Sequence, residues 1–179
     1  MGRVKRKDSS STKGSTVAST ATLHTNHGDI TLNLFEDQAP KTVANFVGLA
    51  NGTKEYLDPR TGQPTTGKFY DGLVFHRVIE GFMAQTGDPT ATGEGGSDLP
   101  DLKAEFSREP HVRGVCSMAR TSDPNSANSQ FFICFDDATF LDRQYTVWGQ
   151  VTSGMEHIDA LPKGEPPRNP GKIVKAMVN

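Results

Sequence analysis

The sequence predicts a mainly β protein, built as a closed antiparallel barrel with two short helices covering its open ends. Short apolar runs rich in β-branched and aromatic residues recur along the chain, and turn-forming residues separate them. The composition agrees with many turns, with 18 Gly and 11 Pro among 179 residues. Only two segments have apolar residues at helical spacing.

The first two strands are predicted within residues 21–35, where polar and apolar side chains alternate on both sides of a tight turn at residues 27–28. The spacing then changes to that of a helix over residues 40–52, with Pro40 near its start and Gly52 at its end. Four residues form the apolar face of this helix: Val43, Phe46, Val47 and Ala50.

The segment 53–68 contains several Pro and Gly residues and is expected to be a connecting loop. Another Gly-rich segment, residues 93–96, is expected to be a flexible excursion. The remaining elements are a strand at 73–79, a break at Glu80-Gly81, a continuation at 82–88, strands at 114–119, 129–135 and 145–151, a helix at 153–161 with Met155, Ile158 and Leu161 facing inward, and a last strand at 172–178.

One domain is expected over residues 20–179, because this length can bury a core large enough to fold unaided. Residues 1–19 are expected to form a flexible basic tail without the apolar middle region of a signal peptide, and the protein is expected to be cytoplasmic. The formal net charge of −2 gives no reason to expect nucleic acid. No apolar stretch is long enough to predict a membrane span.

The two cysteines, Cys116 and Cys134, lie in predicted strands and are expected to be buried, reduced thiols. The sequence has no C-x-x-C motif, and the five histidines lack the spacing of metal ligands. We therefore expect no metal and no cofactor.

The stretch FHRVIEGFMAQTGD, residues 75–88, carries polar side chains among residues typical of a core. Arginine is rarely buried unless it is paired. Strand alternation groups Arg77 with Phe75 and Ile79. Either the stem of Arg77 covers apolar surface while its head reaches water, or the side chain faces a ligand. Two further clusters, SQFFICF and ATFLDRQYTVWG, also mix aromatic and polar residues, but spacing alone does not bring them together.

FHRVIEGFMAQTGD, SMARTSDPNSANSQFFICF and FLDRQYTVWGQV together resemble the cyclophilin family of peptidyl-prolyl cis–trans isomerases, and APKTVANFVGLANG resembles the first helix of that family. The resemblance extends from about Ala21 to Val178. It implies an eight-stranded barrel capped by two helices, with the active groove on its outer face. It also implies that Arg77 is the catalytic guanidinium. The implied substrate-binding residues are Phe82, Met83, Gln85, Ala119, Arg120, Gln130, Phe132, Phe140, Leu141 and Tyr145.

The partners that this resemblance implies are proline-containing peptides and unfolded or folding proteins, bound by a monomer that can also act as a chaperone. Phe140 stands where many members have a Trp that contacts cyclosporin, so weak binding of that drug is expected. Tyr145 replaces a His at the rim of the groove, so the substrate preference is expected to differ. Arg120 stands where Asn is frequent in the family, which is a departure from the family pattern at that position.

Three alternatives remain open at this point. The same barrel can hold proline-containing peptides without useful catalysis. A hydrolase can use His76 or His111 with Ser117, Ser126 or Ser129, although none of these serines has the strand–turn–helix context of a nucleophile; a hydrogen-bonded core histidine is the other interpretation of His76. The basic tail can contact nucleic acid or an anionic surface.

Overall fold

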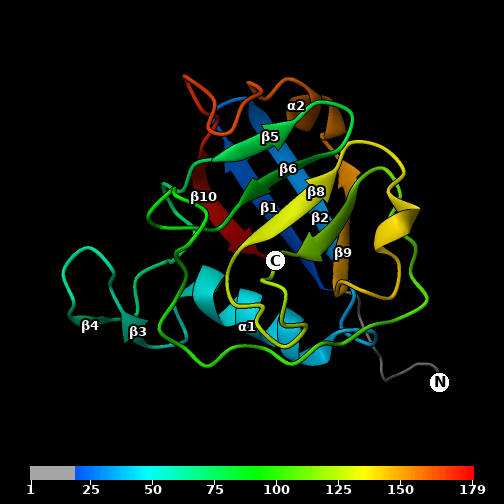
Figure 1. The fold of residues 1–179 in the computed structure, drawn as a ribbon. Helices are drawn as coiled ribbons and strands as arrows, with labels where there is room; N and C mark the ends of the chain where they lie inside the picture. The colour runs from blue at the N-terminus through cyan, green and yellow to red at the C-terminus, as the bar shows by residue number, and fades with distance from the viewer. Residues whose placement is uncertain (1–18) are drawn as a thin grey trace.

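The computed structural model describes residues 19–179, which form a strongly curled sheet with two helices and a small hairpin (Figure 1). The predicted basic tail therefore lies outside the described residues except for Ser19. The helices are α1 (Pro40–Asn51) and α2 (Met155–Asp159). The strands are β1 (Thr20–Thr25), β2 (Gly28–Leu34), β3 (Tyr56–Leu57), β4 (Pro64–Thr65), β5 (Arg77–Ile79), β6 (Met83–Thr86), β7 (Val115–Met118), β8 (Phe131–Cys134), β9 (Val147–Ser153) and β10 (Ile173–Val178).

The main sheet has eight strands in the order β10-β1-β2-β9-β7-β8-β6-β5, and every neighbouring pair is antiparallel. The prediction of eight antiparallel strands is confirmed, but the prediction of a closed barrel is wrong, because the ladder is open between β5 and β10. The outer edge of β5 is occupied instead by Gly164, which exchanges both backbone hydrogen bonds with Val78 at 2.9 and 2.8 Å. Before β5, the Val74–Lys172 bridge and three backbone hydrogen bonds between residues 72–75 and 171–173 cross the gap without forming a continuous ladder.

The strand predicted at 73–79 is shorter in the structure, since β5 begins at Arg77. Phe75 is fully buried in the main core, whereas Ile79 packs against the small cluster on the other face of the sheet. The expectation that Phe75 shares a face with Arg77 and Ile79 is therefore wrong, because regular alternation does not extend back to residue 75.

The two helices lie at opposite ends of the sheet (Figure 1). The predicted apolar face of α1 is confirmed: Phe46 is buried, and its ring centroid lies 4.6 Å from that of Trp148 and 5.0 Å from that of Tyr70. At the other end, Ile158 and Leu161 are buried and Met155 packs on the core, as predicted. Both helices thus extend the core beyond the ends of the strands.

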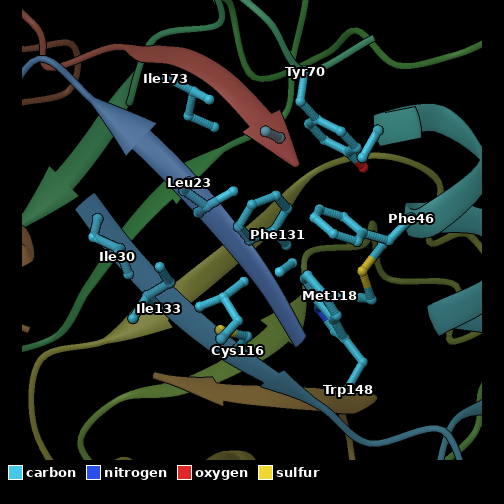
Figure 2. Packing of buried hydrophobic residues seen from close by; sticks show 14 of the residues in the cluster. Leu23, Ile30, Phe46, Tyr70, Cys116, Met118, Phe131, Ile133, Trp148 and Ile173 are labelled. Atoms are coloured by element: carbon cyan, nitrogen blue, oxygen red, sulfur yellow. The ribbon is translucent and has the colours of Figure 1, made fainter. Parts of the chain in front are cut away.

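The core is formed by the inward side chains of the sheet, seen in Figure 2 around Leu23, Ile30, Phe131 and Ile133. Cys116 belongs to this core, whereas Cys134 belongs to the cluster on the opposite face. Both thiols are free and buried, as predicted. Burial raises the pKa of both thiols, that of Cys134 to about 12, so they stay protonated at neutral pH.

Segment 53–68 is more structured than predicted, because β3 and β4 form a small hairpin that projects from the body of the molecule (Figure 1). A short 3-10 helix, η1 (Thr139–Leu141), was also not predicted.

Across residues 19–179, neither helix is long and apolar enough to cross a membrane. The same residues contain no cluster of His, Cys, Asp and Glu that could hold a metal ion.

Candidate active site

The candidate site is built on the face of β5, β6, β7 and β8 that points away from the main core. On β8, Phe131 and Ile133 face the core while Phe132 and Cys134 face the other way. The strand register places Arg77 opposite Gln85, and Gln85 opposite Phe132. A guanidinium, an amide and an aromatic ring therefore lie in one row across three strands, although up to 55 positions separate them in the sequence.

A cavity of about 340 Å³ lies over this row. Ten of the eleven residues predicted for the site line it: Arg77, Phe82, Met83, Gln85, Ala119, Arg120, Phe132, Phe140, Leu141 and Tyr145. The eleventh, Gln130, lines an adjoining cavity of about 420 Å³, which shares Gln85, Ala119 and Arg120 with the first. The structure therefore brings the three sequence clusters together.

The apolar half of the first cavity has a buried floor and an exposed lip. Met83 and Phe132 are almost fully buried, and Phe132 meets the ring of Tyr145 edge to face at 5.9 Å. Phe140, carried by η1, is 67% exposed and stacks on Phe82 with ring centroids 5.8 Å apart. The result is an open apolar slot that can take a compact apolar group.

The polar half of the cavity is a chain of hydrogen bonds that begins at Arg77. Its Nη1 donates to Oε1 of Gln85 at 3.3 Å, and Nε2 of Gln85 donates to Oε1 of Gln130 at 2.9 Å. Nε2 of Gln130 then donates to the carbonyl oxygens of Gly93 and Gly95 at 3.0 and 2.8 Å. Because arginine can only donate, Arg77 fixes the direction in which both amides are oriented.

Arg77 also forms an ion pair that the sequence did not predict. Its Nε donates to Oε1 of Glu165 at 3.0 Å, and the two side chains are 43% and 57% exposed. Glu165 lies 88 positions away in a segment rich in Gly and Pro, which gives no pattern that could have indicated this contact.

The wall of the adjoining cavity is held by Asp88, a buried carboxylate at the end of the β6 region. Asp88 accepts hydrogen bonds from the backbone N–H groups of Thr92, Gly93 and Gly95 and from the hydroxyl of Thr90. Burial by itself raises the pKa of Asp88, but these hydrogen bonds outweigh it and the pKa is lowered. The excursion predicted at 93–96 is thus anchored to one ionised side chain.

Arg120 lies between the two cavities. Its Nε and Nη2 donate to the carbonyl oxygen of Gln144 at 2.9 and 2.7 Å, and its guanidinium stacks over the ring of Tyr145 at 4.4 Å. These contacts hold both side chains at the rim of the apolar slot.

His111 and Ser117 form the arrangement that the hydrolase alternative requires, but it is buried beneath the site. Nδ1 of His111 lies 3.0 Å from Oδ1 of Asp142, and Nε2 lies 2.9 Å from the Ser117 hydroxyl. Both His111 and Ser117 are fully buried, so this hydroxyl cannot meet a substrate. The His111 ring stacks against Phe132 at 6.3 Å, which makes the group a support for the cavity floor.

The other parts of the hydrolase alternative are also unfavourable. Ser129 is buried and donates to the carbonyl oxygen of Gly87, and Ser126 donates to that of Asp123. His76 is buried as predicted, but its ring nitrogens have no hydrogen-bond partner within residues 19–179, contrary to the expected hydrogen-bonded core histidine. Burial lowers the pKa of His76 and of His111.

Comparison with known proteins extends over nearly all of the described chain. Residues 20–178 match the family model described as cyclophilin type peptidyl-prolyl cis-trans isomerase/CLD. A probable peptidyl-prolyl cis-trans isomerase of Brucella suis is 47% identical over 175 residues, covering 89% of this chain and 82% of that protein. Peptidyl-prolyl cis-trans isomerase A of Mycobacterium tuberculosis is 49% identical over 136 residues, covering 74% of this chain and 72% of that protein.

Solved structures show the same similarity. A crystal structure of a Cryptosporidium parvum cyclophilin type isomerase superposes with a TM-score of 0.78 at 29% identity, covering 91% of this chain and 98% of that one. A second crystal structure of the C. parvum protein, obtained in the presence of the dipeptide Ala-Pro, gives a TM-score of 0.76 at 30% identity, with 89% and 98% coverage.

Proposed function

Because the chain belongs to the cyclophilin-type family of peptidyl-prolyl cis–trans isomerases and is an enzyme of that class, we propose that Arg77 provides its catalytic donor beside an apolar slot for the proline ring. We also propose that its substrates are proline-containing segments of unfolded and folding proteins, so that the enzyme assists folding. The observation that carries the proposal is the single cavity in which Arg77 meets Phe82, Met83 and Phe132.

The chemistry requires no covalent step. An amide bond resists rotation with a barrier of about 18–20 kcal/mol, because rotation breaks its resonance. In the twisted transition state the proline nitrogen regains a lone pair, and a donor directed at that nitrogen stabilises the twisted state more than the planar one. A guanidinium can supply this hydrogen bond and remains charged in proteins.

The apolar slot makes the donor effective. A proline ring held against Met83 and Phe132 stays fixed while the residue before it rotates. Burying these surfaces also lowers the local dielectric constant, which strengthens a hydrogen bond from the guanidinium. The Gln85–Gln130 chain lies along the path that the rest of the peptide would follow, where its amides and the backbone near Ala119 can bind peptide groups.

The ion pair with Glu165 is compatible with this role. A half-exposed pair contributes only about 0–1 kcal/mol, so it favours one orientation of the guanidinium without withdrawing it from a substrate. Within residues 19–179, Nη2 of Arg77 donates to no protein group. This nitrogen is therefore available to a substrate at the edge of the slot.

We expect Arg77→Ala to lower kcat/KM by about a hundredfold or more, because removal of one preorganised donor costs about 2.7–4 kcal/mol in other enzymes. The assay is protease-free: isomerisation of an Ala-Pro peptide is followed by exchange NMR. Arg113→Ala is the matched control, because Arg113 is a similarly half-exposed arginine, paired with Asp159. Near-normal turnover by a folded Arg77→Ala protein would reject the catalytic role, and no turnover by the wild type would favour a module that only binds peptides.

A further inference from the structure

To act as the proposed donor, the guanidinium of Arg77 must also be held in one orientation. An arginine side chain has many rotamers, and a donor that samples them all is seldom directed at the proline nitrogen. Two contacts restrict it here: Glu165 accepts from Nε at 3.0 Å and Gln85 accepts from Nη1 at 3.3 Å. Because the group is planar, fixing these two nitrogens also fixes the direction of Nη2.

The backbone beside Glu165 is held at the edge of β5, next to Arg77 itself. Gly164 pairs with Val78 through the two backbone hydrogen bonds described above. Gly164 has φ 145°, and a side chain at this position would have its Cβ 2.8 Å from the carbonyl oxygen of Pro166 and from Cα of Pro167. Pro167 is buried, which anchors the segment on its other side. The carboxylate therefore reaches Arg77 from a fixed backbone.

We propose that Glu165 is a positioning residue for the isomerase reaction: it orients the Arg77 guanidinium so that Nη2 points into the cavity. This inference rests on the proposed catalytic role of Arg77. It adds a residue from the segment between α2 and β10, which lines neither of the two cavities. Glu165 acts through Arg77 and does not contact the substrate.

The first test compares Glu165→Ala with Glu165→Gln. We expect Glu165→Ala to lower kcat by about threefold to tenfold with KM nearly unchanged, because a half-exposed pair gives a modest bias but catalysis is sensitive to the placement of the donor. Glu165→Gln keeps an acceptor oxygen and should restore kcat to within about twofold of the wild type. Unchanged kcat in Glu165→Ala, a change confined to KM, or a faster enzyme would overturn the proposal.

Two controls separate positioning from general effects. Asp159→Asn removes the carboxylate of the Arg113–Asp159 pair, which is exposed to a similar degree, and it should leave kcat unchanged; an equal loss in this variant would contradict a specific role for Glu165. In an Arg77→Ala background, Glu165→Ala should have almost no further effect, because the group that it orients is gone. A full additional loss there would mean that Glu165 acts independently of Arg77.

A spectroscopic measurement reports on the geometry itself. In ¹⁵N–¹H spectra, the Nε–H resonance of Arg77 should be shifted and protected from exchange in the wild type and in Glu165→Gln, and should collapse toward free arginine in Glu165→Ala. If Arg77→Ala retains activity, the catalytic assignment itself fails. If Arg77→Ala is inactive but the Glu165→Ala resonance and kcat match those of the wild type, only the positioning inference fails.

Discussion

The aromatic residues of the cavity differ in what they contribute, because they differ in burial. Met83 and Phe132 are almost completely removed from water, so they stabilise the fold as well as forming the floor of the slot. Phe140 is 67% exposed and stacks on the ring of Phe82. An exposed aromatic ring adds little to folding, and its apolar surface is available to a ligand.

We expect Phe140→Ala to change the free energy of unfolding by less than about 0.5 kcal/mol, as is usual for exposed positions. KM for an Ala-Pro peptide should nevertheless rise severalfold, because the lip of the slot is lost. Urea unfolding and NMR-detected isomerisation measure the two effects. Phe106→Ala, an exposed phenylalanine outside both cavities, should change neither; equal KM values for the two variants would contradict a binding role for Phe140.

At the scale of single residues, the long motifs located the cavity lining, whereas contacts between residues distant in the sequence were missed. The family resemblance, and not spacing, assigned ten side chains to one site, and these ten share one cavity. Glu165 could not have been predicted, because nothing in the sequence indicates that residue 164 pairs with β5. The face assigned to Phe75 was wrong because strand alternation was extended past the true start of β5.

At the scale of elements, the junction between β6 and β8 controls the polar half of the site. Gly87 follows β6 with φ 94°. A Cβ there would collide with the carbonyl oxygen of Ser129 and would lie 2.9 Å from Cα of Gln130. Only glycine allows β6 to approach β8 closely enough at this point for Gln85 and Gln130 to form their hydrogen bond.

We therefore expect Gly87→Ala to destabilise the protein by more than about 2 kcal/mol, since backbone strain of about 1–3 kcal/mol adds to the collision. Gly72→Ala is the matched control, because Gly72 has φ 86° but, apart from its chain neighbours, no atom lies within 4 Å of the position that its Cβ would take, so its cost should be limited to the backbone strain without the added collision. Chemical denaturation compares the two variants. Similar losses of stability would show that close packing at Gly87 is unimportant.

Strand positions could be predicted from the sequence better than strand pairing. The runs at 114–119, 129–135 and 172–178 all contain the observed strands, because their composition already favours extended structure. The hairpin of β3 and β4 was missed, because strands of two residues leave no periodic signal. Register and sheet order depend on long-range contacts, so the row from Arg77 to Phe132 became visible only in the structure.

At the scale of the whole molecule, the two faces of the curled sheet carry different groups of side chains. One face forms the main core together with α1 and α2, and the other carries the small cluster around Met83 and Phe132. The predicted closed barrel is not needed for this arrangement. The open edge of β5 is what admits residue 164, and with it the carboxylate of Glu165.

The buried histidines and the proposed donor predict that stability and activity respond differently to pH. In the folded protein, burial lowers the pKa of His76 and of His111 below the usual 6.5. For His111, this effect outweighs the contact with Asp142, which raises the pKa. The unfolded chain then binds more protons than the folded one near and below pH 6.5, so the free energy of unfolding must decrease as the pH falls through this range. The proposed reaction uses a hydrogen-bond donor and no general base.

We expect urea denaturation to show a clear loss of stability between about pH 7.5 and about pH 5.5, where histidines titrate but most carboxylates do not. Over about pH 6 to 8, where the protein remains folded, kcat/KM should stay nearly constant because no general base takes part. Constant stability over the first range would mean that the buried histidines are accommodated in charged form. A bell-shaped activity profile would instead assign the proton-dependent step to a titrating group, with His76, next to Arg77 in the chain, as the first candidate.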